Sequence, residues 1–439
     1  MPSGLKLVVV GGGSSYTPEL IQGIIAHRSD VAVERIALVD VTPGAERQRV
    51  VRGLAERLIK KSGLTIHVEE FLDLKQALKG ADIVFSQLRV GGMKARARDE
   101  RIPARYGLLG QETVGPGGFA NALRTIPTAL EIAEAIEQIC PKAWCLNFTN
   151  PSGMVTEAIL RHSSVRTIGL CNVPFNIQAV LATVLSKRVE DVSLLMYGLN
   201  HLSFVRRVLV EGSDITDVVL AFLRANGQGT AQANIQYIPF SGRVIEAIGL
   251  IPNDYLRYYW YTREMVRRQR EDLEAGEGTR AIRVMAIEAD LFRKYRDPHV
   301  TEVPSELAQR GGAHYSDVAI SLMLALVGGQ VQEMAVNVLN QGAIDGLGWD
   351  AGVEVTCRVD QDGAHPLAIG AMDLPVRGLI QQVKAYEELT IQAAVACDRA
   401  IALAALIANP LVPSAEVAEN LLDDILLENQ ADLSRGWSR

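Results

Sequence analysis

The chain has 439 residues, of which 48% are apolar and 22% are charged, an ordinary composition for a folded soluble protein. This length predicts two domains, and a net charge of −7 argues against a nucleic-acid-binding protein, whose surface would be basic. No apolar run reaches the roughly 20 residues of a membrane span, and no secretory leader opens the chain. Because the five cysteines show no C-x-x-C spacing, we expect a cytoplasmic protein without disulfides.

The first half alternates short apolar runs with helical patterns, which predicts a parallel α/β sheet. The expected strands are Leu5–Val10, Arg35–Val39, Thr65–His67, Ile83–Gln87, Ala143–Phe148 and Thr167–Leu170. The expected helices between them are Pro18–Ala26, Gly44–Lys61, Leu72–Leu78, Ala120–Ile139 and Pro151–His162.

The pattern changes after Cys171 and becomes mainly helical from about Ile215. A short antiparallel pair and one later strand are expected at Val192–Leu199, Ser203–Val210 and Val353–Val359. Long helical patterns cover Ser316–Asn340 and Arg377–Ile407. We therefore expect an α/β protein with a Rossmann-like, mostly parallel sheet domain over residues 1–195. A mainly helical α+β domain for substrate, metal and oligomer contacts is expected over residues 196–439.

The stretch KLVVVGGGSSYTPEL, residues 6–20, places a glycine turn between the first strand and the first helix. In a dinucleotide-binding fingerprint, Gly11 makes the tight turn and Gly13 lets a pyrophosphate approach N–H groups at the helix N-terminus. Ser14 and Ser15 add hydroxyl donors beside the phosphates. Tyr16 replaces the third glycine of the fingerprint, which shifts the packing of the helix without removing the site.

Asp40 ends the second expected strand, in the segment RIALVD. A carboxylate there accepts hydrogen bonds from the ribose hydroxyls and repels a 2′-phosphate, which favours NAD over NADP. The alternative is that Gly11–Gly13 is only a strand-to-helix turn. The preceding strand, the following helix and the acidic residue favour a nucleotide site.

Two potential metal ligands, Cys171 in GLCNVP and His201 in YGLNH, each follow an expected strand. Residues just past strand ends can converge at one edge of a sheet. Thiolate and imidazole suggest zinc or iron before manganese, and the alternative is a buried thiol and a turn histidine. A lactate- or malate-type dehydrogenase would need a histidine paired with an aspartate. No such pair can be identified, and His314 and His365 lie in expected loops.

Seven short motifs strengthen the nucleotide hypothesis. They are GGGSSYTPEL (11–20), GQETVGPGGF (110–119), NFTNPSG (147–153), GLCNVP (169–174), GLNHLSF (198–204), DYLRYY (254–259) and DGAHPL (362–367). In this order they resemble family 4 of the glycoside hydrolases, over residues 6 to about 400. Members of that family hydrolyse glycosides with NAD and a divalent metal, and their glycine loop carries a tyrosine at the place of Tyr16.

The resemblance implies a redox-assisted elimination in place of the usual carboxylate pair. In this mechanism NAD⁺ oxidises C3 of the sugar, a base removes the C2 proton, the aglycone leaves, water adds, and NADH reduces C3 again. Cys171 and His201 are the implied metal ligands, and the family points to Mn²⁺. Tyr255 matches the C2 base, although Tyr258 and Tyr259 are close in sequence. The alternative is that all three tyrosines are core aromatics.

The segment CNVP, which begins at Cys171, resembles the 6-phospho-β-glucosidases of the family. The 6-phospho-α-glucosidases carry an aspartate general acid at the position of Asn172. The asparagine fits a β-linked substrate, but it leaves the proton donor to the leaving group undefined. We therefore expect a 6-phospho-β-glucoside as the substrate.

Four further residues are expected near the substrate. Asn150, in TNPSG, matches a family residue that contacts the sugar and its phosphate, and the alternative is an Asn-Pro turn. Arg96 and Arg280 are the best cationic candidates for the 6-phosphate, and exposed arginines are the alternative. Glu112, in GQET, is expected near the nicotinamide or the sugar.

Other functions remain open from the sequence. Within the family, the substrate could be a 6-phospho-galactoside or an α-linked glycoside. A net 2-hydroxy-acid dehydrogenase would accumulate NADH, and a non-catalytic NAD sensor would not need Cys171, His201 and Tyr255 together. Family members assemble as dimers or tetramers, so a homodimer or homotetramer is expected.

Overall fold

The first six strands form a parallel sheet of the Rossmann type. Their bounds are β1 Leu5–Val10, β2 Val33–Val39, β3 His67–Phe71, β4 Ile83–Ser86, β5 Trp144–Asn147 and β6 Thr167–Gly169. The spatial order β6-β5-β4-β1-β2-β3 reverses direction between β1 and β4, and open α/β sheets bind ligands outside the carboxyl strand ends at such a point. The predicted fold class is confirmed. The third strand begins later than expected because its pairing with β2 starts at His67 opposite Arg35.

Helices connect these strands. They are α1 Thr17–Ala26, α2 Ala45–Ser62, α3 Leu74–Leu78, α4 Gly92–Arg105, α5 Gly115–Ile139, α6 Ser152–His162 and α7 Asn172–Val184, with short 3₁₀ turns η1 Thr42–Gly44 and η2 Val189–Asp191. The helices α4 and α7 were not expected from the sequence. In α4 the segment GMKARARDERIPAR is strongly charged, so a continuous apolar stripe does not reveal it.

Three strands from the second half extend the same sheet. They are β11 Gln332–Leu339, β13 Gly352–Asp360 and β14 Gly363–Pro366, which add antiparallel to the β6 edge in that order. The expected helix over Ser316–Asn340 is therefore wrong in its second part. The helix α13, Tyr315–Gly328, stops before Gly329, whose φ of +74° favours glycine. The residues beyond it pair with β6 and β13 as a strand.

A smaller antiparallel sheet comprises β7 Val192–Leu199, β8 Leu202–Val210, β9 Ser213–Asp214 and β10 Ile251–Pro252. The pair β7 and β8 matches the expected antiparallel pair, and Asn200 and His201 form the turn between them. The Thr356 hydroxyl of β13 donates to the Leu194 carbonyl over 2.7 Å and accepts from the Met196 N–H over 2.8 Å. This contact fastens the small sheet to the large one.

The remaining elements are mostly helical. They are α8 Thr216–Asn226, α9 Gly242–Ile248, η3 Asp254–Leu256, α10 Arg257–Trp260, α11 Thr262–Glu274, α12 Arg280–Arg296, η4 Ser305–Arg310, β12 Ile344–Asp345, β15 Gly370–Ala371, α14 Leu374–Ala396, α15 Arg399–Ala408, α16 Ala415–Glu428 and η5 Arg435–Ser438. The expected helix over Arg377–Ile407 is two helices, because Cys397 adopts a φ of +53° between α14 and α15.

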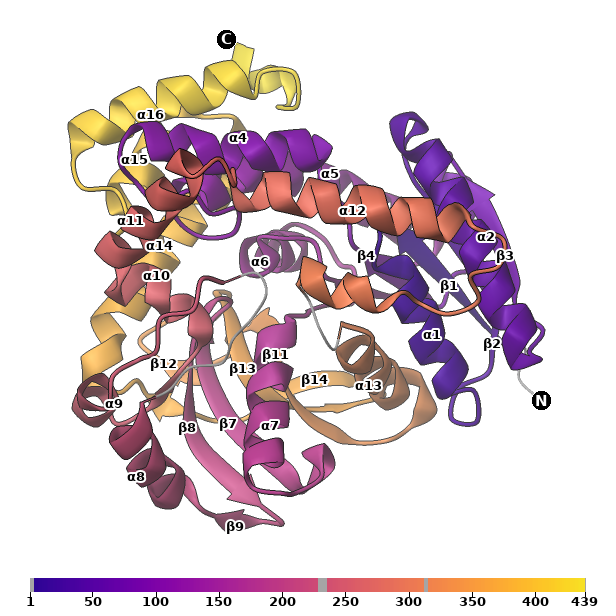
Figure 1. Cartoon of the computed structure of the whole chain (residues 1–439), viewed down its shortest axis with the longest axis horizontal. Helices are drawn as coiled ribbons and strands as arrows, with labels where there is room; N and C mark the ends of the chain where they lie inside the picture. Colours follow the sequence, from indigo (N-terminus) through magenta and orange to yellow (C-terminus); the bar gives the residue numbers. More distant parts are fainter. Residues whose placement is uncertain (1–3, 228–234, 312–314, 439) are drawn as a thin grey trace.

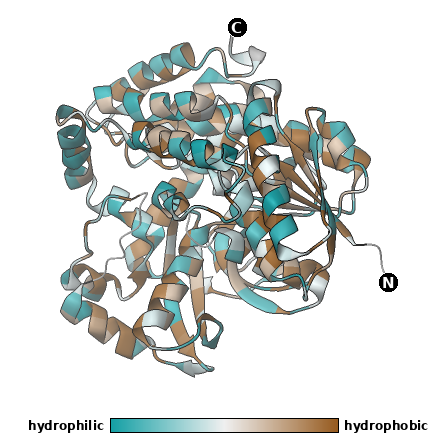
Figure 2. Cartoon of the chain, turned by 45° about the vertical axis from the view of Figure 1, so that its right-hand side comes forward, coloured by the Kyte–Doolittle hydropathy of each residue, from teal (hydrophilic) through white to brown (hydrophobic). Residues whose placement is uncertain are grey.

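The computed structural model describes residues 4–227, 235–311 and 315–438, so His314 lies outside them. In these ranges, no helix combines the length and apolarity that a bilayer crossing requires. Figure 1 shows α12 lying across α2 and α4, so the second half of the chain covers helices of the Rossmann-type sheet. Apolar residues concentrate in the strands of the large sheet (Figure 2), which form the centre of the core.

Candidate active site

The glycine turn follows β1 at the strand-order reversal. Gly11 has a φ of +83°, and a Cβ atom there would lie 2.8 Å from the Gln87 carbonyl oxygen. The N–H groups of Gly11 and Gly12 donate to the Val39 carbonyl over 2.9 and 3.0 Å. The turn is therefore packed between β2 and the segment after β4, and only glycine fits its first position. This backbone cradle before α1 suits a pyrophosphate.

Asp40 lies directly after β2 and faces the same turn. Its Oδ2 atom accepts a hydrogen bond from the Gly13 N–H over 2.9 Å, and its Oδ1 accepts from Val41 over 2.8 Å. A Cβ atom on Gly44 would lie 2.4 Å from Oδ1. The carboxylate thus anchors the glycine turn at the end of the second strand, where a ribose would lie in a fold of this type.

The side chains after the glycines contact the second half of the chain. Ser14 Oγ accepts from the Tyr16 N–H over 3.3 Å, whereas the Ser15 hydroxyl is buried and donates to Glu288 over 3.1 Å. The Tyr16 hydroxyl donates to the Gly311 carbonyl, and the guanidinium of Arg310 lies 4.1 Å from the centre of its ring. The loop is therefore clamped by α12 and η4.

An ion-pair network connects α4 with the loop before α5. Glu112 pairs with Arg89 and, over 2.7 Å, with Arg96, and Arg96 also pairs with Glu100 over 2.8 Å. Burial and the neighbouring charge of Arg96 lower the pKa of Arg89 to about 9. Two guanidiniums and two carboxylates thus form one network, which fixes the guanidinium N–H groups as possible donors to an anion.

Arg280 opens α12 beside this network. Burial and the charge of Arg96 lower its pKa, and its Nη2 atom donates to the carbonyls of Gln309 and Arg310 over 2.9 and 3.0 Å. Thr279 is the residue before α12, and its hydroxyl forms no capping hydrogen bond. This hydroxyl and the Nε atom of Arg280 are both buried without a hydrogen-bond partner. Buried polar groups in this state are rare, and the two donors suit an oxyanion.

The two candidate metal ligands lie at the mouth of the sheets. Cys171 immediately precedes α7, and His201 occupies the β7–β8 turn with a φ of +64°. Burial lowers the pKa of His201 to about 3, so its imidazole is neutral and able to bind a metal. Burial raises the pKa of the Cys171 thiol, so a metal would have to displace its proton. Within the described ranges, no group of three or more His, Cys, Asp and Glu could hold a metal.

Tyr255, in η3, brings the third candidate group to the same place. Its ring stacks on that of His201, with 3.7 Å between centres and 1° between planes, and Tyr258 meets it edge-on at 5.6 Å. Burial raises the pKa of Tyr255 well above its usual value, whereas a hydrogen bond with Thr113 and the charge of Arg96 act in the opposite direction. Tyr255 thus links His201 to the arginine network.

Asn150 and Asn172 lie at the ends of neighbouring strands. The Asn121 side chain donates to the carbonyls of Asn150 and Glu112 over 3.2 and 3.1 Å, so the segment after β5 is tied to the ion-pair network. Asn172 is the first residue of α7 and adjoins Cys171. The structure thus gathers the predicted residues into a glycine-turn cluster and a metal-and-arginine cluster.

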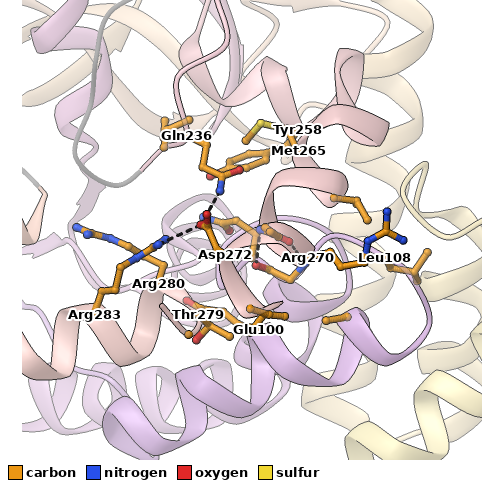
Figure 3. Close-up of a pocket in the computed structure, with 18 of the residues that line it drawn as sticks. Glu100, Leu108, Gln236, Tyr258, Met265, Arg270, Asp272, Thr279, Arg280 and Arg283 are labelled. Carbon is orange, nitrogen blue, oxygen red and sulfur yellow. Dashed lines mark hydrogen bonds and ion pairs between the residues drawn. The ribbon is translucent and has the colours of Figure 1, made fainter. Parts of the chain in front are cut away.

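A cavity of about 260 Å³ adjoins the second cluster. Figure 3 shows Tyr258, Glu100, Thr279 and Arg280 around it, with Asp272 joined to Gln236 and Arg283. Its lining includes neither the candidate metal ligands nor Tyr255. The cavity therefore reaches the side of the site that carries the unpartnered Arg280 and Thr279 donors.

Sequence reasoning missed several residues of this site. Arg89 and Thr279 stand in segments without a distinctive pattern. Glu354 had a visible signal, because it is a carboxylate between two valines in the first, apolar part of the strand GVEVTCRVD. It is fully buried, and burial raises its pKa to about 7.

Comparison with known proteins agrees with these clusters. Residues 6–187 match the sequence model of the family 4 glycosyl hydrolases, and residues 196–412 match that of the family 4 glycosyl hydrolase C-terminal domain. The chain belongs to family 4 of the glycoside hydrolases. It is 42% identical to a Bacillus subtilis (strain 168) protein named "Probable 6-phospho-beta-glucosidase", over 100% of this chain and 99% of that protein.

Three solved structures of two enzymes extend the comparison. The 6-phospho-β-glucosidase of Thermotoga maritima, solved with NAD and glucose 6-phosphate, superposes with a TM-score of 0.89 at 37% identity, covering 98% of this chain and 100% of that one. The same enzyme has been solved with manganese, NAD⁺ and glucose 6-phosphate. A 6-phospho-α-glucosidase from gut microorganisms has a TM-score of 0.89 at 29% identity, covering 98% of this chain and 99% of that one. The fold alone therefore does not separate the α-specific from the β-specific enzymes.

Proposed function

We propose that this chain hydrolyses 6-phospho-β-glucosides to glucose 6-phosphate and an aglycone, with NAD⁺ and Mn²⁺ as cofactors. The observation that carries this proposal is the cluster of Cys171, His201 and Tyr255 beside Arg96, with a glycine turn on the same sheet. The relatives named above support the choice of substrate and cofactors. The two cofactors would together supply hydride transfer at C3 of the sugar and a Lewis acid for its C2 and C3 oxygens.

The protein residues have separate tasks in this reaction. Cys171 and His201 would hold the metal. Tyr255 removes the C2 proton. The pKa of its buried phenol is too high for this task, and a metal ion bound beside it would, together with Arg96, favour the phenolate. The stack on His201 keeps the hydroxyl at a fixed distance from the metal ligand.

The phosphate is held by the arginine network. Arg96 and Arg280 supply charge from α4 and α12, and the unpartnered Thr279 hydroxyl and Arg280 Nε supply hydrogen bonds. Asn150 contacts the sugar from the end of β5. The side chain of Glu112 holds Arg89 and Arg96 in place, which orients the guanidiniums towards the phosphate.

The nucleotide occupies the glycine turn, with Gly11, Gly13 and Ser14 at the pyrophosphate and Asp40 at the ribose. Ser15 supports this loop through Glu288. Residues 1–195 thus carry NAD⁺ and part of the substrate site, and residues 196–439 add His201, Tyr255 and Arg280 to that site and supply the surfaces of a homodimer or homotetramer.

Asn172 follows the metal ligand Cys171 and carries no titratable proton, which favours the β-linked substrate. The substrate is a phosphorylated sugar of the kind produced by phosphorylating import, so the enzyme acts in the cytoplasm. A 6-phospho-galactoside, which differs at one hydroxyl, is the second candidate substrate.

The test is release of nitrophenol from 4-nitrophenyl β-glucoside 6-phosphate by the reduced protein, with NAD⁺ or Mn²⁺ omitted in turn. We expect activity only with both present, and no lasting NADH absorbance. Activity that survives removal of bound NAD would overturn the mechanism. Activity only on the α-linked or galacto analogue would overturn the substrate assignment.

A further inference from the structure

Glu354 is an unusual residue for its place in the core. It lies in the middle of β13 and is fully buried, and a carboxylate in such a place costs several kcal/mol unless it is well paired. Across the described parts of the chain, no cation forms an ion pair with it. Both of its oxygens instead accept hydrogen bonds from neutral side chains. Oε1 accepts from Asn200 over 3.0 Å, and Oε2 accepts from Ser203 over 2.7 Å.

The first of these contacts leads to the metal ligands. Asn200 directly precedes His201, and its side-chain amide also forms a hydrogen bond with the thiol of Cys171. Its Oδ1 atom accepts from the Gly153 N–H over 3.4 Å. Because the amide has two N–H bonds in one plane, holding one on Glu354 directs the other towards the sulfur.

The second contact leads to the candidate base. The Ser203 hydroxyl donates to Glu354, and its oxygen accepts from the Asn253 side-chain amide over 3.1 Å. The Oδ1 atom of Asn253 in turn accepts from the Tyr255 N–H over 2.9 Å, and this bond caps η3. The ring of Tyr255 then returns to His201 by stacking at 3.7 Å. Two chains of contacts from one carboxylate therefore end on adjoining parts of the same site.

We propose that Glu354 is a positioning residue that holds the metal ligands Cys171 and His201 and the base Tyr255 in one fixed arrangement. The assignment of those three residues rests on the proposed function. Glu354 itself does not touch the substrate. It acts through Asn200 on the ligands and through Ser203 and Asn253 on the base, which is the role that outer-shell carboxylates have in other metal sites.

The test compares Glu354→Ala, Glu354→Gln and Ser203→Ala. The affinity for Mn²⁺ is measured by electron paramagnetic resonance of the free ion, and that for NAD⁺ by calorimetry, both without turnover. We expect Glu354→Ala to weaken Mn²⁺ binding about 10- to 100-fold and to leave NAD⁺ binding within twofold. Glu354→Gln should restore part of the loss, because its carbonyl still accepts from Asn200.

Ser203→Ala separates the two chains of contacts that start at Glu354. It removes the contact towards Asn253 and Tyr255 and leaves the contact of Glu354 with Asn200. We expect Mn²⁺ affinity within twofold of the original, a lower kcat, and a larger kinetic isotope effect when C2 of the substrate carries deuterium, because proton removal becomes slower. This variant also keeps the proposal testable if Glu354→Ala does not fold.

Thr356→Val is the matched control. Thr356 lies two residues further along β13 and also hydrogen-bonds to the small sheet, but at Leu194 and Met196. Loss of this contact should lower Tm, but Mn²⁺ affinity and kcat should stay within twofold of the original, because Glu354, Asn200 and Ser203 keep their hydrogen bonds. The proposal is overturned if Glu354→Gln and Ser203→Ala behave like this control, or if all the variants lose metal affinity in proportion to Tm. If the original protein binds Mn²⁺ but does not cleave the phosphoglucoside, the proposed function fails. The Mn²⁺ affinities of the Glu354 variants still test the role of Glu354 in that case.

Discussion

The glycine turn and the metal-and-arginine cluster are built in opposite ways. The turn, residues 11–13, is contiguous in sequence, and its shape depends on the absence of side chains and on backbone N–H groups. In the cluster, by contrast, Cys171, His201 and Tyr255 come from three separate segments and are joined by buried side chains. The first region is therefore sensitive to added atoms, and the second is sensitive to lost polar contacts.

This difference also decides how each region depends on the rest of the fold. The glycines of the turn pack against β2 and the segment after β4, which all belong to the first half of the chain. The cluster needs β13, from the far end of the chain, to place Glu354 beneath the β7–β8 turn. The two regions should therefore fail separately when they are altered.

The largest effect is expected at a metal ligand. Cys171→Ala removes one of the two proposed protein ligands, so we expect activity with Mn²⁺ and NAD⁺ to fall about 1000-fold or more. NAD⁺ affinity should stay within twofold, because the turn is built independently. Steady-state assays and calorimetry measure both quantities. Cys357→Ala, which removes another buried thiol, is the control, and equal losses in both variants would contradict the ligand assignment.

Glu288 connects the two halves and is expected to affect stability and its pH dependence. Although burial acts to raise it, the charges of Arg310 and Arg47 lower the pKa of Glu288 to about 2. Because this value lies below that of a free glutamate, the ionised group stabilises the fold above about pH 4.5, and this contribution disappears as the pH falls towards 2. Glu288→Gln should cost about 3 kcal/mol at pH 7 and less at pH 4.

Urea unfolding at pH 7, 5 and 4 measures this difference. Glu264→Gln removes a half-buried carboxylate at the surface that also pairs with two arginines, Arg267 and Arg268, and it should have a much smaller effect. If the loss of unfolding free energy in Glu288→Gln stays constant or grows as the pH falls, the ion pairs are not its cause.

Gly11→Ala tests the backbone-built region directly. The added methyl group would lie 2.8 Å from the Gln87 carbonyl at a φ of +83°, so the turn must shift. We expect NAD⁺ affinity to fall about 10- to 100-fold, with Mn²⁺ affinity unchanged. Gly63→Ala carries the same conformational cost at a φ of +73° with nothing within 4 Å, and its NAD⁺ affinity should be normal. Loss of Mn²⁺ binding in Gly11→Ala would show that the two regions are coupled.

The smallest effect is expected at Asp40, where charge and anchoring can be separated. Asp40→Asn keeps an acceptor for the Gly13 N–H but removes the charge that repels a 2′-phosphate. We expect the preference for NAD⁺ over NADP⁺ to fall about tenfold. Asp40→Ala also removes the anchor, so it should weaken both nucleotides. Equilibrium binding of NAD⁺ and NADP⁺ distinguishes them, and an unchanged preference in both variants would place the ribose elsewhere.

Much of the secondary structure could be predicted from local sequence. Alternating apolar runs placed the first six strands, and the β7–β8 pair was expected almost to the residue. The glycine turn could be placed because its residues are adjacent in the chain, and Asp40 because it ends the next strand, which pairs with β1. Cys171 and His201 were paired on the expectation that both follow strands of one sheet. In the structure β6 belongs to the large sheet and His201 to the hairpin turn of the small antiparallel sheet, so the packing of the two sheets brings them together.

The tertiary structure alone decided the remaining features. A helical apolar pattern and a buried strand look alike in sequence, so β11 was mistaken for the end of a helix. Only its pairing with β6 and β13 brings Glu354 beneath the metal site. The sharing of Glu112 between Arg89 and Arg96, and the unpartnered Thr279 hydroxyl, likewise arise where α4, α5 and α12 meet. Local sequence determines where the chain turns and which face is apolar, whereas long-range packing determines which polar groups are buried together, because that depends on contacts between distant segments.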